Sequence, residues 1–366
     1  MSRLSQVFAH IFQLVLPAIE TVLEPLTDRQ RKLAAILETI QMNKFFPGPW
    51  YLFGRPRKSR VALAHSFVAK MVYNLATTRD LIELLNSTPN LRRLCGWDKV
   101  GDIPSESTFS RAFAEFANTE LPQKVHAALI EEYEKEKLVG HISRDATDIV
   151  SREKAIKKKS KKELAKEKPK KKRGRPKKGE ERPGPEPTRI QRQRTMGLEE
   201  MVKELSQDCD FGFKSKDGQL YRWKGYKLHF DWADGEIPIS MLLTSASVHD
   251  SQAAIPLATM SAQRVTSLYD LMDAAYDAKE IREFSLSLGH IPIIDKNQRR
   301  GEPVEIEPAS KRRYDERSTA ERGNSFFKES FGGGHEVRFR GAQKAMAHLM
   351  WGVVALTADR LLNLLV

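Results

Sequence analysis

One segment of the chain is too highly charged to join a folded core. The 27 residues from Arg152 to Lys178 hold 16 Lys and Arg residues against three Glu residues. This segment alone accounts for the formal net charge of +13, and the remainder of the chain is balanced. Because so charged a segment cannot bury enough apolar surface to offset the entropy of ordering it, we expect a mobile insertion over residues 151–210. Its localised charge favours a polyanionic partner.

The sequence before this insertion has the pattern of helices. Apolar residues recur at helical spacing from Phe8 to Ile19, and residues 1–135 are expected to be all-α. The chain start lacks a small-residue cleavage site, so we interpret it as a helix rather than a signal peptide. No stretch has 18 uncharged apolar residues, and no membrane span is expected. Cys95 and Cys209 form no CxxC or Cys/His pattern, which fits reduced thiols in a cytoplasmic protein and argues against a zinc site.

Strand patterns lie on both sides of the insertion. Residues 141–150 mix apolar and polar positions as a half-buried strand does, and residues 220–232 alternate. Asp234-Gly235 predicts a hairpin turn into a second strand. Further strands are expected at 267–273 and 290–297. The part of the chain after the helices is therefore expected to be a mixed α/β structure.

A polar motif near the C-terminus has the spacing of one helix face. Residues 314–328 read YDERSTAERGNSFFK, and four residues recur there at gaps of three, four and seven: Tyr314, Arg317, Glu321 and Lys328. A carboxylate between two cations stays ionised, which suits a metal ligand. The cations and the tyrosine hydroxyl suit phosphate contacts. A solvated helix face with ion pairs one turn apart would give the same pattern.

This motif resembles the Y-(2)-R-(3)-E-(6)-K signature of DDE-type bacterial insertion-sequence transposases. Residues 103–113, IPSESTFSRAF, are similar to the IPSxSTFxRxF segment in the N-terminal region of many such transposases. The resemblance implies an α/β RNase H-like core, a mixed sheet flanked by helices, over residues 138–366. It also implies that the all-α N-terminal domain binds the terminal repeats of the element or holds partners together.

The resemblance selects three acidic residues as catalytic and metal-binding: Asp145, Asp273 and Glu321. Asp145 stands in an Asp-Ala-Thr context on the first expected strand, and Asp273 opens an Asp-x-x-Tyr-Asp motif. The neighbouring Asp148 could be mistaken for the first, and Asp270 should point to the other face of its strand. Three such carboxylates would bind two Mg²⁺ ions, for which Mn²⁺ can substitute.

The implied reaction is cleavage at the ends of the element followed by joining of those ends to target DNA. Tyr314, Arg317 and Lys328 would hold the phosphates. The implied partner is double-stranded DNA, both terminal inverted repeats and target, with a dimer assembled on it. The implied location is the bacterial cytoplasm, at the nucleoid. Two alternatives stay open: an RNase H-like nuclease without strand transfer, and a non-catalytic DNA-binding protein derived from a transposase.

The basic insertion contains Arg173-Gly174-Arg175-Pro176, which resembles an AT-hook. Proline favours an extended backbone and glycine has no side chain to clash, so Arg173 and Arg175 could lie in a narrow A·T-rich minor groove. The flanking lysines would add phosphate contacts. The alternative is a lysine-rich solubilising linker.

Two further residues have both a structural and a functional interpretation. His249 could lie near the active site, although a capping role at the following helix is the simpler reading. Trp223 could stack on an unpaired base. Packing in the core is the simpler reading for Trp223.

Overall fold

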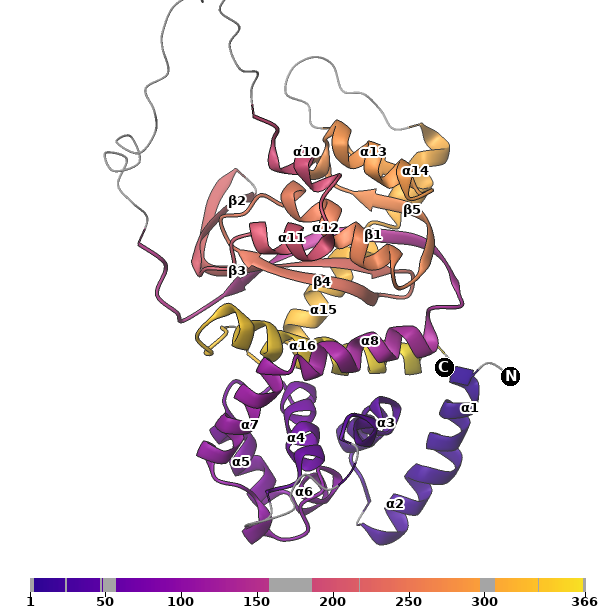
Figure 1. Ribbon diagram of the computed structural model, residues 1–366. Helices are drawn as coiled ribbons and strands as arrows, with labels where there is room; N and C mark the ends of the chain where they lie inside the picture. The colour runs from indigo at the N-terminus through magenta and orange to yellow at the C-terminus, as the bar shows by residue number, and fades with distance from the viewer. Residues whose placement is uncertain are drawn as a thin grey trace, which may run out of the picture.

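The computed structural model describes residues 3–23, 25–46, 48, 57–157, 186–216, 218–296, 307–334 and 336–364. Arg173 and Arg175 of the AT-hook-like motif lie outside the described residues. The structure combines one mixed β-sheet with helices on both of its faces and a helical N-terminal part (Figure 1).

Six strands form the sheet: β1 Leu138–Val150, β2 Asp210–Lys216, β3 Gln219–Ala233, β4 Ile237–Ser245, β5 Thr266–Met272 and β6 Ile291–Ile294. The spatial order is β4-β3-β1-β5-β6, and β2 pairs with the first part of β3. β1, β3 and β4 pair antiparallel, whereas β5 and β6 run parallel to β1. The predicted strands and the turn at Asp234-Gly235 are thus confirmed, and β2 is a strand that the sequence pattern did not predict.

The two faces of the sheet are covered by different helices. Side chains alternate between the faces of β3, and Asp231 contacts α12 (Ser251–Ala262) while Trp232 contacts α15 (Ser318–Phe326). Two short helices pack on the α12 side, α10 (Arg189–Gln193) and α11 (Leu198–Glu204). These two helices lie in the last part of the segment 151–210, over which a mobile insertion was expected.

The N-terminal part is helical, as expected, and consists of α1 Arg3–His10, a π-helical turn Ile11–Val15, α2 Leu16–Val22, α3 Asp28–Ile40, α4 Arg60–Val72, α5 Thr78–Ser87, α6 Pro89–Leu94, α7 Glu106–Asn118 and α8 Leu121–Tyr133. The C-terminal helix α16 (Ala342–Asn363) lies beside α8, between the sheet and the remaining N-terminal helices (Figure 1). One continuous apolar core joins these helices, α16 and the sheet. The helical part is therefore packed on the α/β part through α16.

The first helix is long and apolar for its position. Residues Arg3–Val22 form a helix of 20 residues that could cross a membrane by length and composition alone, and 11% of the most apolar window is buried. The search of the sequence for 18 consecutive uncharged apolar residues did not identify this helix. Signal sequences and core helices of soluble proteins pass the same test, so this helix is weak evidence for a membrane.

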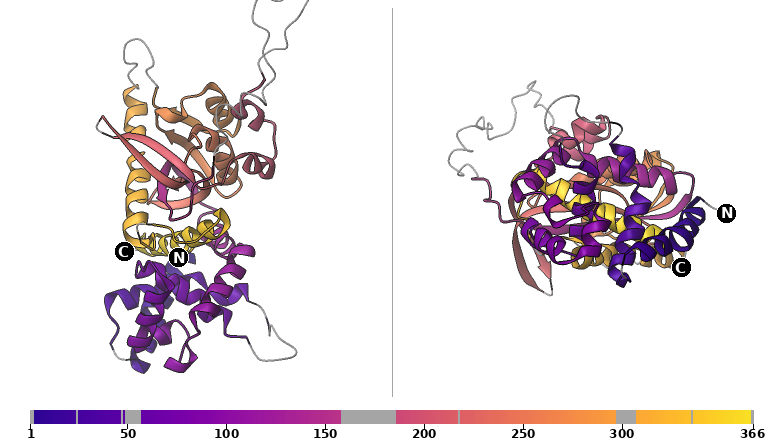
Figure 2. Two further views of the ribbon diagram at one scale, coloured as in Figure 1. Left: turned by 90° about the vertical axis from the view of Figure 1, so that its left-hand side faces the viewer. Right: turned by 90° about the horizontal axis from the view of Figure 1, so that it is seen from below.

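The motif from Tyr314 to Lys328 is not one helix. Tyr314 lies in the last turn of α14 (Pro308–Asp315). Glu321 lies in α15, and Lys328 lies in a π-helical segment, Phe327–Phe331. A tight turn at Glu316-Arg317 separates α14 from α15. Ser318 and Thr319 come directly after this turn. Residues of these types favour helix starts over helix interiors, which is consistent with a new helix beginning here. The helical segment nevertheless runs along one side of the sheet toward α16 (Figure 2).

Candidate active site

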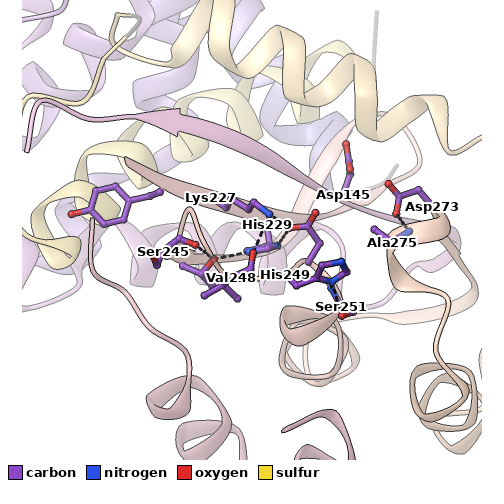
Figure 3. Close-up of polar contacts among 12 residues, drawn as sticks. Asp145, Lys227, His229, Ser245, Val248, His249, Ser251, Asp273 and Ala275 are labelled. Carbon is purple, nitrogen blue, oxygen red and sulfur yellow. Dashed lines mark hydrogen bonds and ion pairs between the residues drawn. The ribbon is translucent and has the colours of Figure 1, made fainter. Parts of the chain in front are cut away.

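The register of two neighbouring strands places Asp145 next to Asp273. β1 and β5 are parallel, and Arg144 on β1 is the partner of Met272 on β5. Asp145 and Asp273 are the residues that follow these two partners. Asp273 directly follows β5, and its Oδ1 accepts a hydrogen bond of 2.9 Å from the amide of Ala275. Figure 3 shows both carboxyl groups where β5 ends. Two of the three predicted acidic residues are therefore neighbours.

Both carboxyl groups hold their protons more tightly than usual. Burial raises the pKa of Asp145 to about 6, and the nearby charge of Asp273 acts in the same direction. Burial also raises the pKa of Asp273, with the charge of Asp250 adding to it. The guanidinium of Arg317 opposes both effects, but does not cancel them. The pair is a site of negative charge that a cation would stabilise.

Helix α15 lies over this pair. Asn324 donates a hydrogen bond of 2.9 Å from Nδ2 to Oδ2 of Asp145. This close approach needs Gly323, because a Cβ there would come within 2.8 Å of the Trp232 ring on β3. Glu321 lies one turn before Asn324 and therefore shares its side of the helix. The sequence pattern did not select Asn324, although its spacing from Glu321 was visible.

The carboxylate of Glu321 is bound to Arg317 and is 59% exposed. Arg317 also lies over the ring of Tyr314, at 5.6 Å from its centroid. Across the residues that the structure describes, no group of three or more His, Cys, Asp or Glu side chains could hold a metal ion as placed. The structure thus brings Asp145 and Asp273 together, whereas the carboxylate of Glu321 is paired with Arg317.

Lys328 contacts Asp148, which lies three residues after Asp145 on β1. Its Nζ lies 2.9 Å from Oδ1 of Asp148, and Nζ of Lys214 on β2 lies 2.7 Å from the same atom. Burial alone would raise the pKa of Asp148, but these two lysines outweigh burial and hold it below its usual value. Asp148 is therefore an ion-pair partner rather than an unpaired carboxylate.

Asp270 belongs to a separate buried network. It is 1% exposed and accepts a hydrogen bond of 2.7 Å from Ser285 of α13 (Lys279–Ser287), with His290 at 3.3 Å. Nearby, Arg144 and Asp231 form a fully buried bidentate ion pair, at 2.7 and 2.8 Å. These contacts account for Asp270 and confirm that it faces away from Asp273.

The two ambiguous residues have structural contacts. Nδ1 of His249 lies 2.8 Å from Oγ of Ser251, the first residue of α12, which favours the capping interpretation. Trp223 is 5% exposed and donates a hydrogen bond of 3.1 Å to the carbonyl of Tyr226, which favours the packing interpretation.

Comparison with protein families agrees with this arrangement. Residues 186–358 match the family model of a transposase DDE domain, and residues 20–115 match that of a transposase domain of the N-terminal helical part. Over these two segments the chain is similar to DDE transposases. The DDE match contains Asp273 and Glu321 and begins after Asp145. Neither the curated proteins nor the solved structures that were compared give a match.

The matches to transposase domains indicate a transposase function, and such a function implies DNA binding. Enzymes with a transposase DDE domain generally use a divalent metal. The observed mixed sheet flanked by helices and the helical N-terminal region fit a transposase DDE domain.

Proposed function

We propose that this transposase cleaves the ends of an insertion sequence and joins them to target DNA, with Asp145, Asp273 and Glu321 as its catalytic acidic residues. The observation that carries the proposal is the register of β1 and β5, which makes Asp145 and Asp273 neighbours beneath α15. The strand order β4-β3-β1-β5-β6, with three antiparallel and two parallel strands, supports an RNase H-like core.

The donor atoms at this place suit a divalent cation. Asp145 and Asp273 offer carboxylate oxygens whose ionisation burial disfavours, and hard oxygen ligands fit Mg²⁺ or Mn²⁺ better than zinc. When bound, a pair of such ions activates the attacking oxygen and stabilises the leaving oxygen in an in-line displacement at phosphorus. Asn324 holds the orientation of the Asp145 carboxylate through its hydrogen bond.

Glu321 joins the pair only after leaving Arg317. Its side chain is exposed and therefore free to change rotamer, and it lies one turn before Asn324, which bonds to Asp145. A DNA phosphate can take the place of the Glu321 carboxylate on the Arg317 guanidinium, since both anions fit the same fork of donors. DNA binding and completion of the acidic site are thus coupled through Arg317.

Basic side chains extend from this point along the helical segment. Arg312 and Arg313 are exposed in the last turn of α14, before Arg317, and Lys328 follows Glu321. Tyr314, Arg317 and Lys328 would contact the phosphates near the scissile bond, and the further arginines would follow the backbone of the duplex. Holding two element ends together would require a dimer on DNA. We place the activity in the bacterial cytoplasm, at the nucleoid.

The test uses purified protein, DNA with the element ends, and Mg²⁺ or Mn²⁺. We expect end cleavage and strand-transfer products, and we expect Glu321→Gln to abolish both while DNA binding persists. Glu329→Gln, an exposed carboxylate on the following helical segment, is the matched control and should stay active. Cleavage without joining would indicate a nuclease of the same core. An inactive wild-type protein that binds DNA as Glu321→Gln does would indicate a non-catalytic binder.

A further inference from the structure

A fourth acidic residue, Asp250, lies close to the Asp145–Asp273 pair. It immediately precedes α12, on the face of the sheet opposite to α15. After burial, its charge is the largest influence that raises the pKa of Asp273, and it acts on Asp145 as well. The pair therefore has an acidic neighbour, Asp250, on the α12 side of the sheet, opposite to the side on which α15 carries Glu321.

The position of Asp250 is fixed by the way α12 crosses β3. Every second residue of that strand, namely Lys227, His229 and Asp231, points to the α12 face. At one end of the helix, Nζ of Lys227 lies 2.8 Å from Oδ1 of Asp250. It also donates a hydrogen bond of 3.0 Å to the carbonyl of Val248 (Figure 3). At the other end, Ser261 donates a hydrogen bond of 2.7 Å to Asp231. These two anchors hold the start of α12 in place.

Two buried polar atoms around this cluster have no hydrogen-bond partner among the residues that the structure describes. One is the hydroxyl of Tyr276, a residue that is 1% exposed. Tyr276 lies in the turn that follows Asp273, and its amide donates a hydrogen bond of 3.1 Å to the carbonyl of Asp273. Burial raises the pKa of its hydroxyl well above the ordinary value, and the charges of Asp250, Asp145 and Asp273 act in the same direction.

The second such atom is Nδ1 of His229, which is fully buried and lies 4.0 Å from Oδ1 of Asp250. The other ring nitrogen of His229 already bonds to Oγ1 of Thr244, at 2.8 Å. Buried polar groups nearly always have a partner, so two such atoms facing one acidic cluster indicate a polar ligand. Water molecules bound to a cation could supply the missing hydrogen-bond partners.

We propose that Asp250 and the Tyr276 hydroxyl bind the hydration shell of the divalent cation held at Asp145 and Asp273. This inference rests on the proposed function. Mg²⁺ dehydrates reluctantly and keeps several waters, which donate hydrogen bonds to a carboxylate and to a hydroxyl oxygen. Asp250 is thus a positioning residue that acts through water, and Lys227 holds it at the correct side of the site. Groups that act on a metal in this way are expected to tune its affinity.

The experiment measures Mn²⁺ binding to the full chain by calorimetry and by the electron paramagnetic resonance signal of the free ion. We expect Asp250→Asn to weaken Mn²⁺ binding on the order of 10–100-fold, and Tyr276→Phe to weaken it about 10-fold. Lys227→Gln removes the ion pair but keeps the carboxylate, so it should weaken Mn²⁺ binding less than Asp250→Asn does. Glu199→Gln, an exposed carboxylate in the first turn of α11, is the matched control.

Each outcome separates this inference from the proposed function. If Asp145→Asn abolishes Mn²⁺ binding while Asp250→Asn and Tyr276→Phe bind as the wild type does, the inference is wrong and the proposed site stands. If Lys227→Gln weakens binding as much as Asp250→Asn, Asp250 only anchors α12, and the inference is also wrong. If wild-type protein binds no Mn²⁺, the proposed function itself fails. Should Asp250→Asn not fold, Tyr276→Phe decides, because that hydroxyl has no partner to lose.

Discussion

Replacement of Asp145 by Asn should make the metal-free protein more stable at pH 7.5. Burial raises the pKa of this carboxyl from 3.8 to about 6 in the folded protein. The folded state then binds the proton more tightly than the unfolded chain, so ionisation at neutral pH costs folding free energy. At about 1.4 kcal/mol for each pH unit between the two values, the cost is about 3 kcal/mol. Asparagine keeps an oxygen that can accept the hydrogen bond from Asn324.

The same reasoning fixes the pH range of the effect. The cost is complete above pH 6, where both states are ionised, and it shrinks as the pH falls toward 3.8. At pH 5 about half of it remains, or about 1.6 kcal/mol. Below pH 3.8 both states are protonated, and the variant should no longer differ from the wild type.

Urea denaturation of both proteins in the presence of a chelator, at pH 7.5 and pH 5, measures the difference. Asp148→Asn is the matched control on the same strand, because its carboxylate is stabilised by Lys214 and Lys328. That variant should lose about 1 kcal/mol at pH 7.5, the opposite sign. Mn²⁺ should then stabilise the wild type and not Asp145→Asn. A less stable Asp145→Asn protein, or a difference that does not change between the two pH values, would refute the reasoning.

Two further predictions concern DNA. Arg317→Ala should weaken binding to all sequences alike and reduce the slope of log affinity against log salt by about 1. The guanidinium of Arg322 is bound to Glu236, so Arg322→Ala should change neither quantity. Fluorescence anisotropy at several salt concentrations measures both. Deletion of residues 152–178 should leave end cleavage intact while it weakens target binding and removes any preference for A·T-rich targets. Sequencing of insertion sites made by both proteins checks the deletion, and an unchanged preference would contradict the AT-hook interpretation.

The sequence predicted those elements whose own pattern is strong. Alternating residues before Asp234-Gly235 specify β3, the turn specifies β4, and Asp273 closes β5 where the apolar run ends. The three phenylalanines of α7 at helical spacing are buried, as the amphipathic pattern requires: Phe109, Phe113 and Phe116. In each case the local sequence and the tertiary environment favour the same structure.

Elements that depend on distant partners were not predictable in this way. β2 reads DFGFKSK, a polar segment that forms a strand because β3 is there to pair with it, and Gly212 is needed there to admit the Trp223 ring. α10 belongs to a charged segment but packs on α12, where Gln193 donates to the carbonyl of Gln252. The buried pair of Arg144 and Asp231 joins residues 87 positions apart, and no local pattern reveals such a contact.

The placement of Glu321 follows from the same distinction. The spacing of the motif predicts which side of a helix carries Glu321. It does not predict which partner the carboxylate takes, because Arg317 lies one turn away on the same helical segment. Without a divalent ion, a third carboxylate beside Asp145 and Asp273 would be repelled by their charges, whereas Arg317 one turn away offers a favourable ion pair. The pairing of Glu321 with Arg317 is therefore the arrangement that electrostatics favours before metal and DNA bind. It makes Arg317 the residue through which a phosphate can release the third carboxylate.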